Sequence, residues 1–158
     1  MSTSHTDRPD SGAPREHGRP GHDYVARHDE LRCLAPGAGP AVFAARANVT
    51  FAAPTTRAGV ESSVRAFLTT LADDLAAAGC VLVGHIKGTI LADGGCLAFH
   101  LTSMAGSPGL EGEIPAVVAR ATLTVNVIVF GVPESELPEL ATQAWERSRA
   151  PGTTSWAR

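Results

Sequence analysis

Polar side chains recur at every second position of two neighbouring apolar-rich stretches, residues 80–91 and residues 96–103. The polar positions are His85, Lys87, Thr89, His100 and Thr102. Because side chains alternate between the two faces of a β-strand, each stretch is predicted to be a strand with one polar and one apolar face. Asp93-Gly94 between the two stretches is a tight-turn signal. The pattern therefore predicts a hairpin in which Lys87 lies opposite His100.

Alternation and helical periodicity elsewhere in the chain predict four more elements. They are strands over residues 41–52 and 119–130 and helices over residues 57–78 and 134–148. Both strands repeat the alternation of the hairpin, whereas apolar side chains recur at helical spacing in the first helix. Thr55 or Thr56 is suited to cap the start of that helix, and Gly79 suits the left-handed position after its end.

The resulting order, β-α-β-β-β-α, predicts an α+β two-layer sandwich. We expect a mostly antiparallel four-stranded sheet with two helices on one face and with the first two strands parallel. Residues 103–115 are rich in glycine and are predicted to be a long loop. The domain is expected to span residues 40–150, between the two ends of the chain.

Both ends of the chain are predicted to lie outside the domain. Residues 1–39 are polar and rich in proline and glycine, and we predict a disordered tail. Within it, residues 24–34 have the pattern of a short helix. Residues 151–158 are predicted to be loose.

The four strands are expected to place their polar side chains on one face of the sheet. That set combines three fixed positive charges and two histidines and contains no carboxylate, in a chain of net charge -3. The charge asymmetry is the strongest functional signal in the sequence, although a solvated sheet face also favours threonine, lysine and arginine. The predicted polar face comprises Arg46, Asn48, Thr50, His85, Lys87, Thr89, His100, Thr102, Arg120, Thr122, Thr124 and Asn126.

Two functional hypotheses follow from this face. The favoured one is a small binding or accessory protein, expected to be a homo-oligomer, whose face binds an anionic small molecule or a protein partner, including a second copy. Its predicted ligand-binding residues are Arg46, Asn48, His85, Lys87, Thr89, His100, Thr102, Arg120, Thr124 and Asn126. The alternative is a small enzyme in which His85 or His100 moves a proton, Lys87 acts as an electrophile, and residues 103–115 form a lid. We favour binding because no nucleophile with an orienting partner and no catalytic motif can be assigned.

Composition narrows the choice of partner and compartment. A net charge of -3 and a polar face without aromatic platforms argue against nucleic acid. His85 and His100 lack the further ligands that zinc requires, so neither a metal nor a cofactor is expected. No signal-peptide pattern is visible, and no apolar run approaches the about 20 residues that cross a bilayer. With three irregularly spaced cysteines and no CxxC motif, we expect reduced thiols in a cytoplasmic protein without membrane contact.

Overall fold

The computed structural model describes residues 39–149, and all structural statements below concern that part of the chain. The predictions for the N-terminal tail, its short helix at residues 24–34, and residues 151–158 lie outside the described residues. The elements are β1 (Ala41–Thr56), α2 (Arg57–Ala77), β2 (Leu82–Ala92), β3 (Gly95–Leu101), β4 (Gly109–Glu113), β5 (Val117–Phe130), a 3-10 turn η1 (Glu134–Glu136) and α3 (Leu137–Ser148).

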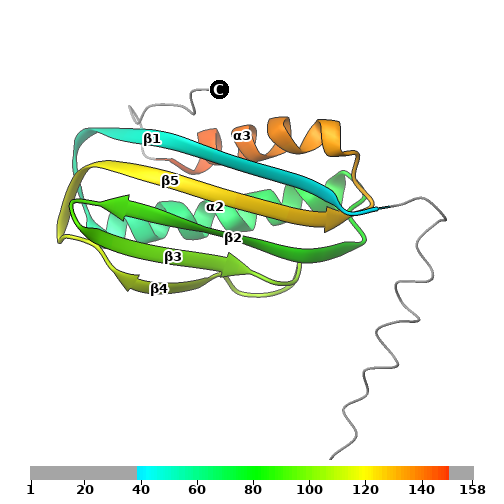
Figure 1. Ribbon diagram of the computed structural model, residues 1–158, viewed down its shortest axis with the longest axis horizontal. Helices are drawn as coiled ribbons and strands as arrows, with labels where there is room; N and C mark the ends of the chain where they lie inside the picture. Colours follow the sequence, from blue (N-terminus) through cyan, green and yellow to red (C-terminus); the bar gives the residue numbers. More distant parts are fainter. Residues whose placement is uncertain (1–38, 150–158) are drawn as a thin grey trace, which may run out of the picture. The chain divides into compact units, whose positions relative to one another are not determined.

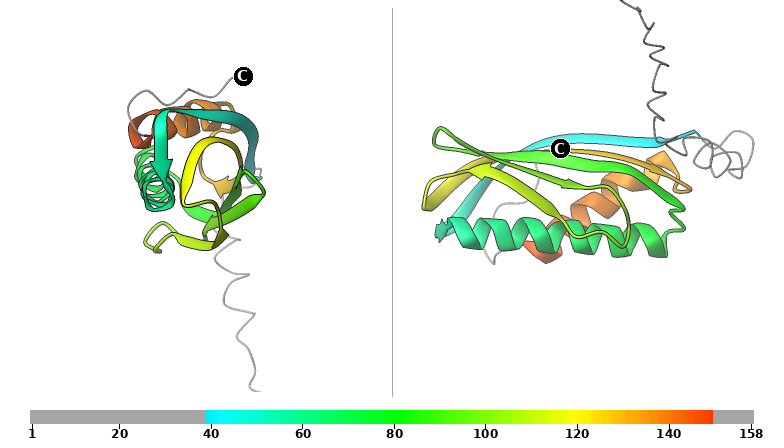
Figure 2. Two further views of the ribbon diagram at one scale, coloured as in Figure 1. Left: turned by 90° about the vertical axis from the view of Figure 1, so that its left-hand side faces the viewer. Right: turned by 90° about the horizontal axis from the view of Figure 1, so that it is seen from below.

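The strands form one antiparallel sheet in the order β1-β5-β2-β3-β4. Both helices lie behind this sheet, so the described part of the chain has two layers (Figures 1 and 2). The predicted α+β class is confirmed, with five strands in place of the four expected. β1 and β2 are parallel to each other, as predicted, because each pairs antiparallel with β5, which lies between them.

The additional strand, β4, lies inside the segment that was predicted to be a loop. It pairs with β3, placing Leu110 opposite Phe99. Two arginines of α2 hold it: Arg65 Nη1 donates to the Pro108 carbonyl at 2.8 Å, and Arg57 Nη2 donates to the Gly112 carbonyl at 3.1 Å. Residues 109–113 therefore extend the sheet and are tied to the helical layer.

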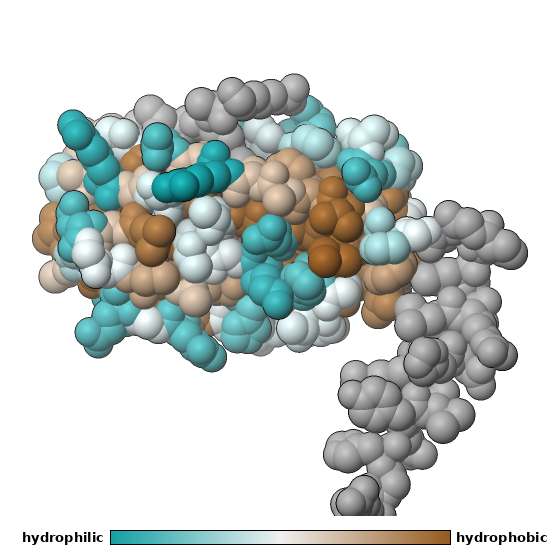
Figure 3. All heavy atoms as spheres, in the orientation of Figure 1, coloured by the Kyte–Doolittle hydropathy of each residue, from teal (hydrophilic) through white to brown (hydrophobic). Residues whose placement is uncertain are grey.

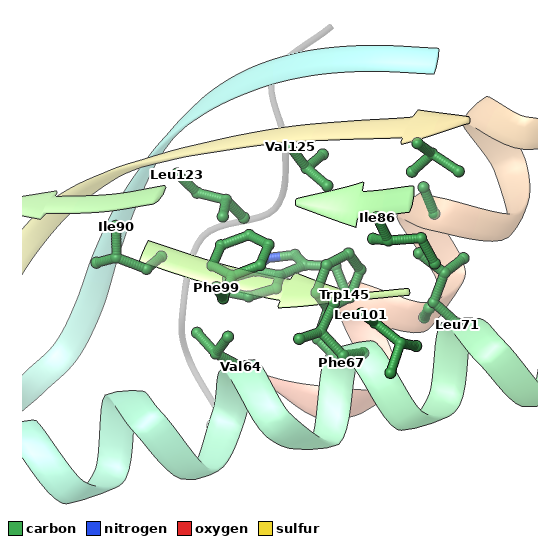
Figure 4. Packing of buried hydrophobic residues seen from close by; sticks show 14 of the residues in the cluster. Val64, Phe67, Leu71, Ile86, Ile90, Phe99, Leu101, Leu123, Val125 and Trp145 are labelled. Carbon is green, nitrogen blue, oxygen red and sulfur yellow. The ribbon is translucent and has the colours of Figure 1, made fainter. Parts of the chain in front are cut away.

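Three aromatic rings join the two layers at the centre of the core (Figure 4). Phe67 of α2 meets Phe99 of β3 edge-on at a centroid distance of 6.5 Å and Trp145 of α3 at 5.7 Å. All three rings are buried. Because they come from three elements distant in sequence, this contact fixes both helices against the sheet.

Element ends differ from the predictions by a few residues. The Thr56 hydroxyl caps α2 by accepting a bond from the Gly59 amide at 3.1 Å, and Gly79 has the expected positive φ of 90°. β1 continues four residues beyond its predicted end, through a register shift between Thr50 and Thr55. The second predicted helix begins as η1 before α3.

In the described residues, no helix is long and apolar enough to cross a membrane.

Candidate functional site

The open face of the sheet, the side turned away from α2 and α3, carries the predicted polar residues. The strand registers align them in rows that run across the strands. Lys87 lies opposite His100 on one side, as predicted, and opposite Asn126 on the other. In the next row Thr124 lies between Arg46 and Thr89. Asn48 then pairs with Thr122, Thr50 pairs with Arg120, and Thr102 follows directly after β3. These positions share one face, and their role in binding stays a prediction.

The lysine and arginine side chains of the open face lack the partners that the other arginines of the described residues have. Arg46, Lys87 and Arg120 form no ion pair or side-chain hydrogen bond within residues 39–149. The arginines of the helical layer all have partners: Arg57 pairs with Glu61, Arg65 with the Pro108 carbonyl, Arg147 with Asp74, and Arg149 with Glu146. Fixed cations without any ion-pair or hydrogen-bond partner are thus confined to the open face in this part of the chain.

Threonine hydroxyls between these cations are partly used within the sheet. The hydroxyl oxygens of Thr89 and Thr124 lie 2.7 Å apart in one hydrogen bond, and Thr122 donates to Asn48 Oδ1 at 3.3 Å. Such cross-strand pairs stabilise the sheet itself. Lysine, arginine and histidine side chains are therefore left as the main groups of this face for contact with another molecule.

A shallow hollow of about 270 Å³ lies beside Lys87, His100 and Asn126. The imidazole of His100 rests on β4, where a Cβ added to Gly109 would lie only 2.3 Å from His100 Cε1. Glycine at position 109 thus allows the ring to lean over β4. The small Ala98 side chain completes the lining between these polar groups.

A second hollow, of about 410 Å³, lies at the other end of the open face around Arg120. Asp93 of the β2–β3 turn also lines it. Asp93 has a positive φ of 41°, and Gly94 follows at 84°, as the predicted tight turn requires. An acidic and a basic side chain therefore line the same hollow.

The expectation of a face without carboxylates is wrong. β4 places Glu111 opposite Ala98 and Glu113 opposite Cys96, so two acids lie along one edge of the open face. Glu113 is also 3.8 Å from Arg57 of α2. The face is consequently positive over β1, β5 and β2 and negative along β4.

Sequence reasoning also missed an apolar end of the open face. Val42 pairs with Ile128, and Leu82 pairs with Phe130. Val42 is 45% exposed and Leu82 is 41% exposed, while Ile128 and Phe130 are half-buried. Figure 3 shows apolar side chains gathered on the right-hand part of this face, where β1 and β2 begin and β5 ends. Continuing the alternation of β5 past Asn126 would have identified this patch.

The two histidines lie on the open face without a carboxylate that could orient them. Neither has a side-chain hydrogen bond to another described residue. Burial lowers the pKa of His85 below its ordinary value, and the charge of Lys87 lowers it further. A neutral His85 fits a general base, but the described residues supply it with no nucleophile or orienting acid.

The segment predicted as a catalytic lid does not have the form of a lid. Its residues 109–113 are strand β4 at the edge of the sheet, held to α2 by arginine side chains. The alternative enzyme hypothesis therefore loses the element that would close its site. Within residues 39–149, no group of three or more histidine, cysteine, aspartate or glutamate side chains is placed to hold a metal ion.

Comparisons with known proteins assign no family to this chain. Neither a family model nor a curated protein matches it. A crystal structure of a Zn(II)-bound triple mutant of the YjiA GTPase matches with a TM-score of 0.36 and 18% sequence identity. The match covers 70% of this chain and 30% of that chain. A similarity of this size supports no conclusion about the function of this chain.

Proposed function

We propose that the protein is a binding module whose open sheet face engages a partner protein with several negative charges. The observation that carries this proposal is the confinement of unpaired cations to that face. The arginines of the helical layer have acids or a carbonyl as partners, but Arg46, Lys87 and Arg120 have none within the described residues. A complementary negative surface would supply the missing counter-charges and steer association.

The spacing of the cations favours an extended partner over a small anion. Arg46 and Lys87 lie on strands separated by β5 and are offset by two residues, which puts their backbones about 12 Å apart. Arg120 is six residues from the partner of Lys87 on the neighbouring strand, about 20 Å away. A phosphate or carboxylate ion could neutralise one of these cations, whereas a surface with several acids could engage all three.

The apolar end of the face favours a protein as the partner. Exposed apolar patches bordered by polar residues mark protein interaction sites as well as ligand-binding grooves. The hollows beside Lys87 and Arg120 are shallow, so they would leave most of a small ligand in water. Binding remains preferred to catalysis because neither histidine has an orienting partner among the described residues.

Titration with poly-L-glutamate tests the proposal. At low salt, the polymer should shift amide NMR signals around Arg46, Lys87 and Arg120 and leave those of the helical layer unchanged. Lys87→Gln should weaken binding about fivefold. Arg147→Gln is the matched control, because it changes the net charge equally on α3, and it should leave binding unchanged. Equal loss in both variants, or a single tight site for inorganic phosphate, would refute the proposal.

A second copy of the chain is the alternative partner. The row that begins with Arg46 on β1 ends with Glu111 on β4, so one molecule carries both signs of charge on this face. Sedimentation equilibrium distinguishes the alternatives. A dimer that dissociates in Arg46→Glu and re-forms when that variant is mixed with Glu111→Arg would identify the partner as a second copy.

We place the proposed binding in the cytoplasm, as the sequence suggests. Fractionation of cells that contain a tagged full chain tests that placement.

A further inference from the structure

We propose that the open face recognises two side chains of one partner segment, an acid and an aliphatic residue spaced two positions apart on an extended chain. The acid binds the row formed by Asn126, Lys87 and His100. The aliphatic side chain binds the apolar end around Val42 and Ile128. The inference rests on the proposed function and names the chemical pattern that the partner protein presents to this site.

The polar row consists of groups that can donate hydrogen bonds to a carboxylate. Lys87 lies between Asn126 and His100 on adjacent strands. An ammonium, an amide NH2 and an imidazole N–H are all suitable donors. Ala44 and Gly109 end the row on the outer strands, and neither has a side chain that would block an approaching acid.

Space for the carboxylate results from the position of the His100 ring. Because Gly109 lacks a Cβ, the imidazole lies over β4, with Nε2 just 2.4 Å from where that Cβ would be. The ring therefore leans toward the sheet edge, and the 270 Å³ hollow beside Lys87 stays open. An alanine at position 109 would force the ring to move.

The apolar end begins one step further along β5. Ile128 is two residues from Asn126 on the same face, which places the two side chains about 7 Å apart. Ile128 pairs with Val42 on β1 and with His85 on β2, and Val42 keeps 45% of its surface exposed. An aliphatic side chain lying there would remove apolar surface from water on both molecules.

The spacing of the two subsites matches the repeat of an extended chain. Side chains at positions i and i+2 of a strand point the same way and are about 7 Å apart. A segment with glutamate and leucine at those positions would reach Lys87 and Ile128 together. A segment with the two residues adjacent would turn one of them away from the sheet.

Two tripeptides of identical composition test the inference on the full chain. They are acetyl-Glu-Ser-Leu-amide, with the spacing proposed, and acetyl-Glu-Leu-Ser-amide, with adjacent side chains. Titrations followed by amide and methyl NMR should show the first binding about threefold tighter. It should shift both the Lys87 amide and the Ile128 methyl signals, whereas the second should shift the Lys87 amide alone.

Variants assign the effect to the two subsites. Ile128→Thr keeps a β-branched residue in the strand and should abolish the difference between the peptides while leaving poly-L-glutamate binding intact. Val117→Thr is the matched control, because Val117 is an exposed residue of β5 (57%) that pairs with Thr56, away from the apolar end. It should preserve the difference. Gly109→Ala should weaken the binding of both peptides if the position of the His100 ring keeps the acid subsite open.

The outcomes separate this inference from the proposed function. Equal affinity of the two peptides in the native chain, with poly-L-glutamate still bound, overturns the two-part recognition and leaves the proposed function standing. Loss of poly-L-glutamate binding as well overturns both. Hexanoate binding more tightly than the spaced peptide overturns the assignment to a protein segment, because the site would then prefer a small amphiphilic acid.

Discussion

Gly88 is the position at which a single methyl group should most disturb the sheet that supports Lys87. A Cβ added there would lie 1.9 Å from the carbonyl oxygen of Thr124 and 2.5 Å from Phe99 Cζ. Gly88 pairs with both β5 and β3, at the centre of the sheet. We therefore expect Gly88→Ala to unfold the protein at lower denaturant concentration than the native chain requires.

The expected loss of stability follows from these distances. Carbon and carbonyl oxygen normally approach no closer than about 3.3 Å, so the two strands must separate locally by about 1.4 Å. About two ladder hydrogen bonds stretched by that amount are lost, at about 1 kcal/mol each. Displacing the buried Phe99 ring adds about 1–3 kcal/mol of overpacking. Alanine stiffens the unfolded chain and offsets about 0.4–1 kcal/mol, which leaves a net loss of about 2–4 kcal/mol.

Urea unfolding measures this loss, with Gly39→Ala as the matched control. A Cβ at Gly39 would meet nothing within 4 Å, so the control contains the effect of alanine on the unfolded chain without the clash. With a urea dependence of about 2 kcal/mol per molar, the unfolding midpoint of Gly88→Ala should fall by about 1–2 M relative to the control. A difference below about 0.5 kcal/mol would show that β2 and β5 can separate at little cost, and the reasoning would be wrong.

Three further predictions concern the pH response, a helix cap and the edge strand. Burial and the charge of Lys87 lower the pKa of His85 in the folded chain, so the unfolded chain binds a proton at His85 more readily. The free energy of unfolding should therefore fall as pH drops from about 7.5 to 5.5. The urea midpoint of His85→Gln should fall less over this pH range than that of the native chain. Thr56→Ala removes the cap of α2 and should cost about 1 kcal/mol in urea unfolding; no measurable change would contradict the cap. Arg65→Ala removes the bond to the Pro108 carbonyl and should speed hydrogen exchange of the β4 amides before those of β3; unchanged β4 exchange would show that the arginine does not hold the strand.

The division of the strands into two faces could be predicted from the sequence because it depends on local alternation. A slip by one residue between β2 and β3 would have turned Lys87 into the core, so the apolar pattern excluded that slip and agreed with the pairing of Lys87 and His100. The Asp93-Gly94 turn selected the same register, since both residues have the positive φ that this turn needs. Local signals of two kinds therefore agreed on one hairpin.

The strand β4 could not be predicted because its stability is not local. Gly109-Leu-Glu-Gly-Glu contains two glycines and no β-branched residue, which is unlike an ordinary strand. It is held by pairing with β3 and by arginines of α2 that are 43 and 55 residues away in sequence. The position of β5 between β1 and β2 likewise depends on long-range pairing, which alternation does not encode.

This missed strand changes the interpretation of the candidate site. Without β4, the open face was expected to lack carboxylates and to bind an anionic small molecule or a protein partner. With Glu111 and Glu113 along one edge, an acidic partner is attracted toward Arg46 and Lys87 and repelled from β4. This uneven distribution of charge would orient an acidic partner on the face, which a uniformly positive surface would not do.

The division between charged and apolar subsites suggests how such a face would act. The cations are solvent-exposed, so each contact with an acid contributes little affinity and is weakened by salt. They would mainly raise the rate of association and orient the partner. Apolar contact at Val42 and Ile128 is insensitive to salt and would set the rate of dissociation. We therefore expect added salt to slow association with an acid–aliphatic segment about tenfold while changing its dissociation rate little. Ile128→Thr should instead speed dissociation and change the association rate little. Stopped-flow kinetics with a labelled peptide would separate the two effects. A shared dependence of both rates on salt would show that the subsites do not act separately.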